Sequence, residues 1–377
     1  MRFADIPFGL PPGHAWLHEG ADGRIPHAQL LVGAEGSAAL PLALAYAQRL
    51  LCPQGTPDDA CGACPSCLMA SKFAHPDLHF SFPVVKRDGD NQSPISDHFL
   101  NDWRSFLTEN PYPVFEHWME FIRAENKQAT FYVEEAKSVL TTLALKPHQG
   151  GKKVLILWMP EKMPDSFANK LLKTIEEPEG DAVLLLISHD EEGVLPTIAS
   201  RCQRLFVPPV PRQALVSYLQ QKGVTEATAT LAAMGSGGAL GMALHLVHHP
   251  ESLRENAELL ALLLRSAYRR SIVDLYAWSE AVAGMIRERQ KAFFQFSLET
   301  LSALVANKHH LPHSDPFALT GTAFSMNGFA QLIQTHQFEQ LRIALEEAES
   351  DIARNGNAKI VLMDFALQTT ASIQKNS

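Results

Sequence analysis

The stretch "LLVGAEGSAALPLALAYA", residues 30–47, joins an apolar run to a glycine-containing loop and then to a segment rich in alanine and leucine. This order predicts a strand, a loop and a helix, which is the arrangement of a phosphate-binding loop. Such a loop reads G-x-x-x-x-G-K-[ST], in which the lysine neutralises phosphate charge and the hydroxyl holds Mg2+. Gly33 and Gly36 keep the entry to the loop. The places of the last glycine, the lysine and the hydroxyl residue are taken by Ala38, Ala39 and Leu40.

A second nucleotide motif is also incomplete. ATP hydrolysis needs acidic residues at the end of a neighbouring strand, where they position Mg2+ and water. The run "KVLILW", residues 153–158, fits the strand, but it ends in Trp158, Met159 and Pro160, with Glu161 two positions too late. A chance strand, turn and helix could explain either departure alone. Two departures in register with both motifs favour a nucleotide-binding architecture that has lost its chemistry.

Five short apolar runs before residue 207 are expected to form strands. Each is mainly apolar on both faces of the expected strand, which is typical of a parallel sheet covered by helices on both sides. The runs lie at residues 29–32, 78–82, 153–158, 182–188 and 204–207. Between them, apolar residues recur at three- and four-residue spacing, as in amphipathic helices. Residues 1–207 are therefore expected to form an α/β domain.

The rest of the chain has only helical patterns. Successive prolines in "VPPVP", residues 207–211, stop strands and helices and indicate a hinge. Three short helical patterns follow within residues 208–249, and longer ones occupy residues 250–377. The expected fold class is α/β plus all-α, with a parallel-sheet domain, a small three-helix domain and a C-terminal helical domain. The polar stretch 84–97 is expected to be a solvent-exposed excursion with no packed core of its own.

Composition limits the classes of function. With 377 residues, 46% of them hydrophobic and 19% charged, the chain can bury a substantial core over two or three domains. The formal net charge of −9 argues against a surface that binds nucleic acid over a wide area, because such surfaces are basic. No apolar run approaches the ~18 residues that cross a bilayer, and the N-terminus lacks a basic start before an apolar core. We expect a cytoplasmic protein without membrane contact.

Four of the five cysteines lie close together in the pattern C-x8-C-x2-C-x2-C. They are Cys52, Cys61, Cys64 and Cys67. Four thiolates complete a closed tetrahedral Zn2+ site with no open position for water, so the site is expected to be structural. Disulfides are one alternative, which a cytoplasmic chain seldom keeps, and an iron–sulfur cluster is another. Cys202 stands apart without a flanking histidine and is expected to be a small buried residue.

Several stretches resemble the delta-prime subunit family of bacterial DNA polymerase III clamp loaders, which belongs to the AAA+ superfamily. They are "RIPHAQLLVGAEG" at 24–36, the cysteine cluster, "HPDLHF" at 75–80, the run 153–188 and "LPTIASRCQRLFVPPV" at 195–210. Within them, "NKLLKTIEEP" and "PTIASRCQ" are highly specific for clamp-loader subunits of this group. The helical remainder matches only in length and helical character, and residues 84–128 are longer and more divergent than the family implies.

The resemblance implies a domain plan. Residues 1–207 would form a RecA-like AAA+ domain with a zinc module at 52–67. Residues 208–249 would form a three-helix lid, and residues 250–377 a helical collar that joins the oligomer.

The resemblance also gives the sequence losses a meaning. In the clamp loader that the resemblance implies, the ATP-hydrolysing subunits keep both nucleotide motifs, whereas the delta-prime subunit has lost them and serves as a rigid stator. The changes at Ala39 and Trp158 fit the stator, and Gly241 occupies the place of an arginine with which the motor subunits sense nucleotide. The implied partners are the delta subunit and the gamma/tau ATPase subunits, with the sliding clamp and primed DNA reached through the complex. The chain would belong to the DNA polymerase III holoenzyme, a DNA-directed DNA polymerase, without catalytic activity or bound nucleotide of its own.

One element of the ATPase machinery is intact: "SRC", which is Ser200, Arg201 and Cys202. It lies between a predicted helical turn and a predicted strand, where a loop can face a neighbouring subunit. An arginine there can reach the γ-phosphate in the neighbour's site and stabilise charge that develops during phosphoryl transfer. With the flanking match, we expect Arg201 to be such an arginine finger supplied in trans, with Ser200 and Cys202 shaping the loop. The alternative is a structural ion pair or a solvated surface residue.

Glu176 and Glu177 look like a catalytic pair, but Pro178 ends their helix, so capping and interface roles are expected instead. Two functions from other classes remain open. An ATP-binding motor subunit would bind Mg-ATP in a modified loop, which Ala39 and Leu40 disfavour. A zinc-module protein that binds nucleic acid directly would show steeply salt-dependent DNA binding.

Overall fold

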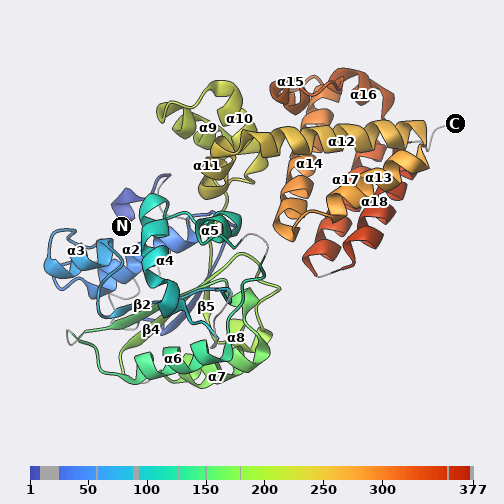
Figure 1. The fold of residues 1–377 in the computed structure, drawn as a ribbon. Helices are drawn as coiled ribbons and strands as arrows, with labels where there is room; N and C mark the ends of the chain where they lie inside the picture. Colours follow the sequence, from blue (N-terminus) through green and yellow to red (C-terminus); the bar gives the residue numbers. More distant parts are fainter. Residues whose placement is uncertain are drawn as a thin grey trace. The chain divides into compact units, whose positions relative to one another are not determined.

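The computed structural model describes residues 1–8, 25–56, 58–87, 93–124, 127–148, 151–178, 180–354 and 356–373. The chain divides into two compact units (Figure 1). Unit 1 comprises Met1–Val210 and Ala239–Gly241, and unit 2 comprises Pro211–Gly238 and Met242–Ser377. The predicted division into three domains stays a prediction.

A five-stranded parallel sheet forms the centre of unit 1. Its strands are β1 (Ala28–Val32), β2 (Leu78–Ser81), β3 (Lys153–Trp158), β4 (Ala182–Ser188) and β5 (Gln203–Phe206). They lie in the order β2-β3-β4-β1-β5, and every neighbouring pair is parallel. The predicted parallel α/β sheet is therefore confirmed. The strand order reverses at β1, so the loop after β1 lies where open α/β sheets bind ligands.

Helices cover both faces of this sheet. Val154, Ile156 and Trp158 of β3 pack on the face of α2, and the alternate residues Leu155 and Leu157 pack on the face of α6 and α7. Figure 1 shows α6 and α7 on one side of the sheet and α2 and α4 on the other. The helices of unit 1 are α2 (Ala39–Leu51), α3 (Pro65–Ser71), α4 (Leu100–Glu109), α5 (Phe115–Phe121), α6 (Val133–Ala144), α7 (Asp165–Glu176) and α8 (Pro196–Ala199). The short 3-10 helices are η1 (Phe3–Asp5), η3 (Ser96–Phe99) and η4 (Pro160–Lys162).

The expectation of an exposed excursion at 84–97 is wrong at both of its described ends, and residues 88–92 lie outside the described residues. Val84, Val85 and Ser96 are buried. Ser96 Oγ donates to the carbonyl of Phe82 over 3.0 Å and accepts from the Phe82 amide over 2.9 Å. The Ser96 amide donates to Glu135 of α6 over 2.7 Å. These buried bonds fasten the segment to the end of β2.

The segment that follows supplies an aromatic core. Trp103 of α4 and Trp118 of α5 meet edge to face, with ring centroids 5.1 Å apart. Trp103 also lies 5.1 Å from Trp158 at the end of β3. All three indoles are fully buried. Residues 93–124 thus pack as part of the α/β unit, close to the carboxyl end of β3.

Unit 2 is helical. Its helices are α9 (Arg212–Gln221), α10 (Glu226–Gly235), α11 (Leu240–His248), α12 (Pro250–Arg269), α13 (Ile272–Ala283), α14 (Arg287–Lys308), α15 (Pro316–Thr320), α16 (Met326–Leu332), α17 (Thr335–Ala353) and α18 (Ala358–Ile373). The first two residues of α11 belong to unit 1. Hydroxyl side chains of Thr225 and Ser271 cap α10 and α13 by accepting amide hydrogen bonds. One apolar cluster runs from Leu219 of α9 to Ile373 of α18, with Trp278 and Phe293 among its buried rings. Among the described helices, none is both long and apolar enough to cross a membrane.

Candidate functional site

The phosphate loop has the backbone shape that its sequence predicts. The Gly33 amide donates to the carbonyl of Ser188 at the end of β4 over 3.1 Å. A Cβ atom at Gly33 would stand 2.6 Å from Ser37 Oγ and 3.1 Å from Cβ of Val207, so a larger residue would require Ser37 and Val207 to shift. Gly36 has a φ of +73°, in the left-handed region that glycine adopts without strain. The predicted order of strand, glycine-containing loop and helix is therefore present, and the lysine and hydroxyl residue of the motif are absent from the sequence at Ala39 and Leu40.

The first turn of the following helix is apolar and buried. Helix α2 begins at Ala39, and Ala39 and Leu40 are 0% and 1% exposed. A lysine at either position would have to leave its charge in the core, which is strongly unfavourable. The buried, apolar environment at the start of α2 therefore suits the apolar side chains of Ala39 and Leu40.

Segment 112–115, which precedes and begins α5, lies against the loop. The Phe115 amide donates to the carboxylate of Glu35, and the Phe115 side chain is itself buried. The ring of Phe115 also carries the ammonium of Lys162 at 4.2 Å from its centroid. The one acidic side chain of the loop is therefore bound by the chain's own backbone.

Gly241 closes the same loop from another side. Its amide donates to the carbonyl of Gly36 over 2.8 Å. A Cβ atom on Gly241 would lie 2.2 Å from the carbonyl oxygen of Tyr112 and 2.9 Å from Cα of Gly36. No side chain of any size fits between these backbones, so the position predicted to replace a nucleotide-sensing arginine is held as glycine by packing.

The ends of β3 and β4 carry a hydrogen-bonded chain that returns to the loop. Trp158 Nε1 donates to His189 Nε2 over 2.8 Å. Because Nε2 accepts, the imidazole proton lies on Nδ1, which is 3.1 Å from the Gly33 carbonyl and donates to it. Where an ATPase would carry an acidic residue, this chain therefore has Trp158. Its indole is connected to the phosphate loop through the hydrogen bond from His189 to Gly33.

The chain turns after β3, and Glu161 lies beyond this turn. Met159 has a φ of +62°, and its amide donates to the Ile187 carbonyl over 2.9 Å, so the chain turns sharply after β3. The Glu161 carboxylate accepts from Ser188 Oγ over 3.0 Å and from the His189 amide over 3.1 Å. Burial raises the pKa of Glu161 despite these bonds. The carboxylate is used internally, at the end of β4.

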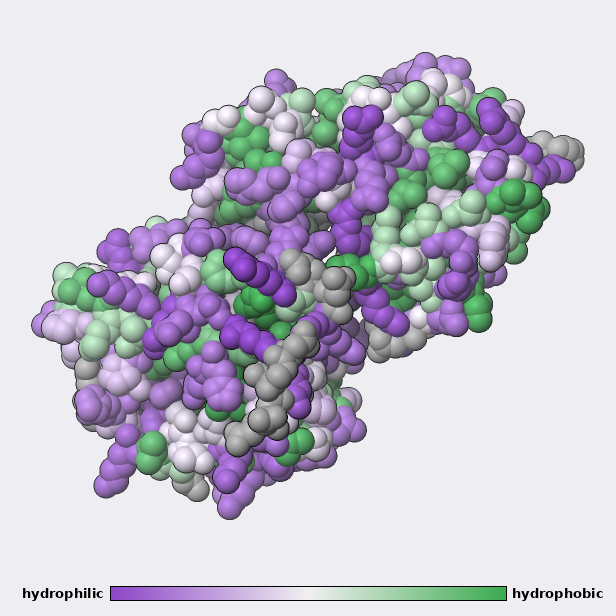
Figure 2. Space-filling model, viewed as in Figure 1, coloured by the Kyte–Doolittle hydropathy of each residue, from purple (hydrophilic) through white to green (hydrophobic). Residues whose placement is uncertain are grey.

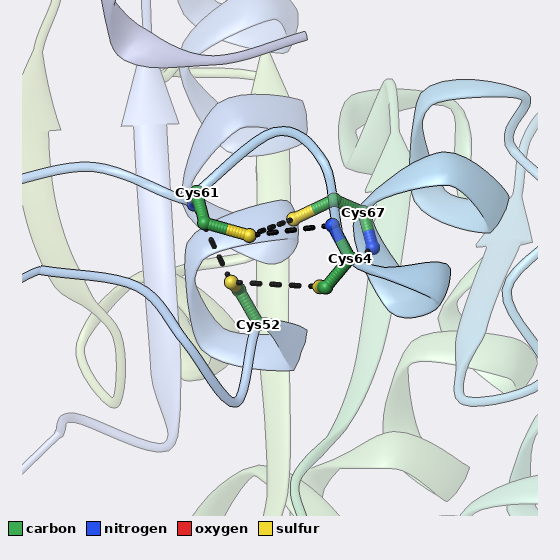
Figure 3. Close-up of side chains that lie close together, drawn as sticks. All are labelled: Cys52, Cys61, Cys64 and Cys67. Carbon is green, nitrogen blue, oxygen red and sulfur yellow. Dashed lines mark hydrogen bonds between the residues drawn. The ribbon is translucent and has the colours of Figure 1, made fainter.

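The four clustered cysteines converge (Figure 3). Cys52 follows α2, Cys61 lies in the next loop, and Cys64 and Cys67 begin α3. The sulfurs of Cys52 and Cys64 are 3.9 Å apart, as are those of Cys61 and Cys67. All four lie within 4.8 Å of one another. All five cysteines of the chain fall within described residues and are free thiols, which excludes the disulfide alternative in this structure.

This geometry fits one metal ion. Four sulfurs at a Zn–S distance of about 2.3 Å stand about 3.8 Å apart in a tetrahedron, and the two 3.9 Å separations agree with that spacing. A multi-iron cluster places several atoms between its thiolates and needs a wider cage. The cluster could therefore hold zinc with Cys52, Cys61, Cys64 and Cys67 as ligands.

Backbone amides support the sulfurs. The amides of Cys61, Cys64 and Cys67 each donate to the sulfur of a preceding cysteine over 3.4 Å. Amide bonds from Ala63 and Cys64 lower the pKa of the Cys61 thiol to about 6, whereas burial raises that of Cys67 to about 12. A bound cation would offset the burial of Cys67, because it favours the thiolate form.

Arg201 lies on the turn between α8 and β5. Its Nη1 donates to the carbonyl of Thr197 over 2.8 Å, and its Nε donates to the carboxylate of Glu176 at the end of α7. The arginine side chain is still 37% exposed. Ser200 is exposed, whereas Cys202 is buried and its pKa is raised to about 11 by that burial. The structure thus combines an ion pair with an accessible guanidinium at this loop.

Sequence reasoning missed three contributors to the phosphate-loop site. Phe115 and His189 have no motif around them, and Glu35 lies in the phosphate loop but has no role there that the sequence alone would assign. The contacts of Glu35 with Phe115 and of His189 with Gly33 join residues far apart in the sequence. The only signal was the unusual length of the segment 84–128.

Together, the five-stranded parallel sheet and the helices on both of its faces define an α/β unit, and the rest of the chain forms a helical unit. Residues 14–211, more than half of the chain, match the family described as "DNA polymerase III, delta subunit". The chain belongs to that family, and the resemblance found in the sequence is confirmed.

Curated relatives agree. The chain is 30% identical to DNA polymerase III subunit delta' of Pseudomonas aeruginosa over 51% of this chain and 46% of that protein. It is 27% identical to the subunit delta' of Escherichia coli over 59% of this chain and 55% of that one. It is 29% identical to the subunit gamma/tau of Mycobacterium tuberculosis over 54% of this chain and 28% of that one. The matches to the delta' subunits thus cover about half of those proteins' length.

Proposed function

We propose that this protein is a delta-prime-type subunit of a bacterial DNA polymerase III clamp loader. In this proposal the chain binds and hydrolyses no ATP, and it supplies Arg201 in trans to the ATP site of a neighbouring subunit. Its membership of the family supports a place in the clamp-loader complex. The geometry of the phosphate loop supports the proposal that a neighbouring subunit, and not this chain, hydrolyses ATP. The chain's role in the DNA polymerase III holoenzyme would then be to help load the sliding clamp onto primed DNA.

The closure of the phosphate loop carries this proposal. Glu35 is bound by the Phe115 amide, and the Gly36 carbonyl by the Gly241 amide. Nothing at the start of α2 offers positive charge, since Ala39 and Leu40 are buried and apolar. A triphosphate carries several negative charges, so a loop without a cation that is already bonded internally is a poor site for it.

The placement of Arg201 supports the second half of the proposal. Arginine fingers in other phosphoryl-transfer systems contribute about 10^3- to 10^5-fold in rate. Arg201 lies on a short turn beside the edge strand β5, with its guanidinium partly exposed. A surface turn next to a sheet edge can face another subunit, and Ser200 and Cys202 would fix the shape of that turn.

The proposed partners are the delta subunit and the gamma/tau ATPase subunits. On the face that Figure 2 draws, hydrophilic residues predominate and hydrophobic ones lie between them. Exposed apolar side chains occur on α13 and α18, two helices that pack against each other. They are Ile272, Val273, Tyr276, Ile360 and Leu367. Exposed apolar side chains of this kind suit a helical collar that contacts other subunits.

A Zn2+ ion held by the four clustered cysteines would stabilise the module that follows α2.

Equilibrium binding of Mg-ATP to the purified chain tests whether the closed phosphate loop excludes nucleotide. A fluorescent ATP analogue should show no saturable binding at concentrations that saturate the gamma/tau subunit, while the chain co-elutes with delta and gamma/tau on size exclusion. Tight Mg-ATP binding would favour a motor subunit instead. Failure to co-elute, together with salt-dependent binding of DNA by the chain alone, would favour a nucleic-acid-binding zinc protein.

A further inference from the structure

The arginine of the SRC loop is held at two points of its guanidinium. Nε donates to Glu176, the last residue of α7, and Nη1 donates to the Thr197 carbonyl of α8 over 2.8 Å. Neither bond uses Nη2. Because the guanidinium is planar, fixing Nε and Nη1 fixes the direction in which Nη2 points.

Glu176 is itself well placed to act as an anchor. The neighbouring Ile175 is fully buried, and its carbonyl lies 2.6 Å from His27 Nε2. The amide of Glu177 caps the helix by donating to the Lys173 carbonyl over 2.9 Å. The backbone that carries the carboxylate is therefore fixed by packing and hydrogen bonds, although the carboxylate itself is 47% exposed.

A second pair on the same strand edge gives a contrast. Arg204 of β5 meets Glu191 over 2.8 Å through Nη1, at the far end of its guanidinium. Both pairs are exposed, and exposed ion pairs contribute little to stability. Stability alone therefore does not explain why the guanidinium of Arg201 is held at both Nε and Nη1, which together fix the direction of Nη2.

We propose that Glu176 is a positioning residue for Arg201, holding its guanidinium plane so that Nη2 can meet a phosphate oxygen of the neighbouring subunit's ATP. This inference rests on the proposed function. An unrestrained arginine side chain loses conformational freedom when it binds a ligand, and misplacement of a catalytic group by about 1 Å can slow a reaction about a hundredfold. By holding the guanidinium of Arg201 in place before the subunits meet, the Glu176 carboxylate would reduce both the loss of conformational freedom on binding and the misplacement of the arginine.

Steady-state ATP hydrolysis by the reconstituted clamp loader tests the inference. The finger-dependent rate is the difference between the wild-type and Arg201→Ala loaders. Glu176→Ala should lower this rate about ten- to a hundredfold with KM unchanged, whereas Glu176→Gln, which keeps an oxygen acceptor for Nε, should retain most of it. Glu191→Ala breaks the Arg204 pair and serves as the matched control, with the wild-type rate expected. The double variant E176A/R201A should be no slower than R201A.

Three outcomes would overturn the inference: full activity of E176A, equal loss in E176A and E191A, or a further loss when E176A is added to R201A. If R201A itself left hydrolysis unchanged, the proposed function would fail as well. A readout on the isolated chain separates the two cases. The Nε–H of Arg201 should give a slowly exchanging NMR signal that E176A removes and E191A leaves, and its absence in the wild type would contradict the anchoring itself.

Discussion

The backbone amide of Gly241 donates a 2.8 Å hydrogen bond to the carbonyl of Gly36, in the middle of the phosphate loop. The same glycine lies so close to Tyr112 that a Cβ atom would stand 2.2 Å from its carbonyl oxygen. Three stretches distant in sequence thus meet at one point through their backbones. The loop that would bind a nucleotide in an ATPase is here a packing element of the fold.

Gly241→Ala should destabilise unit 1. The methyl group would overlap backbone atoms, which cannot move aside as a side chain can, and overpacking of this kind costs about 1–3 kcal/mol. This loss should exceed the roughly 1 kcal/mol that alanine gains over glycine in a helix. Urea unfolding followed by tryptophan fluorescence measures it. Gly284→Ala is the matched control, because its Cβ would meet only ordinary contacts at 3.4 Å, and an equal effect at both sites would contradict the packing account.

Restoring the lost phosphate-loop residues should not restore ATP binding. In the double variant Ala39→Lys and Leu40→Thr, both new side chains enter a buried site, so the expected result is a loss of about 2 kcal/mol or more in unfolding free energy and no saturable Mg-ATP binding. Ala34→Lys adds the same charge at an exposed position of the same loop and should be nearly neutral. Micromolar ATP binding by the double variant would show that the loop is open to nucleotide.

The cysteine cluster should hold one zinc ion per chain. Elemental analysis of the purified protein should find it, and Cys67→Ser, which removes a fully buried ligand, should lose it together with stability of the module. Cys202→Ala should retain the metal, because this cysteine lies outside the cluster. Full zinc content in Cys67→Ser, or none in the wild type, would contradict the assignment.

The buried Glu135 should make stability depend on pH. It accepts from Ser81 Oγ over 2.6 Å and from the Ser96 amide over 2.7 Å, yet burial raises its pKa above the ordinary value of 4.5. The folded state then binds more protons than the unfolded state above that value, so this contribution to stability is full below about pH 4.5 and falls as the pH rises. The unfolding free energy of the wild type should therefore fall relative to that of Glu135→Gln as the pH rises above about 4.5. A difference that grows in favour of the wild type would contradict the raised pKa.

Much of the sheet was predictable because its signals are local. The apolar runs at 153–158 and 182–188 predicted β3 and β4, since strands buried on both faces are apolar throughout. The cysteine spacing likewise predicted the convergence of four sulfurs, because two successive CxxC steps bring thiols together within a short stretch.

The contacts that close the phosphate loop were not predictable. The bond between Glu35 and Phe115 joins residues 80 positions apart, and no spacing rule relates them. Residues 84–97 were misjudged because polar composition suggested exposure, whereas Ser96 and Glu135 satisfy each other inside the core. The ion pair of Arg201 with Glu176 is also a long-range contact, and it gives the predicted finger an anchor that the sequence did not reveal.

The most direct test of the central claim is ATP hydrolysis by the reconstituted clamp loader, stimulated by clamp and primed DNA, with Arg201→Ala compared with Arg204→Ala. Both arginines are exposed and each pairs with one glutamate, so the two variants remove equal charge from the same strand edge. With assembly verified by size exclusion, Arg201→Ala should abolish the contribution of the neighbouring site, a loss of about 10^3-fold or more at that site, and Arg204→Ala should hydrolyse at the wild-type rate. An unchanged rate in a fully assembled Arg201→Ala loader would contradict the account and leave Arg201 as a structural ion-pair residue.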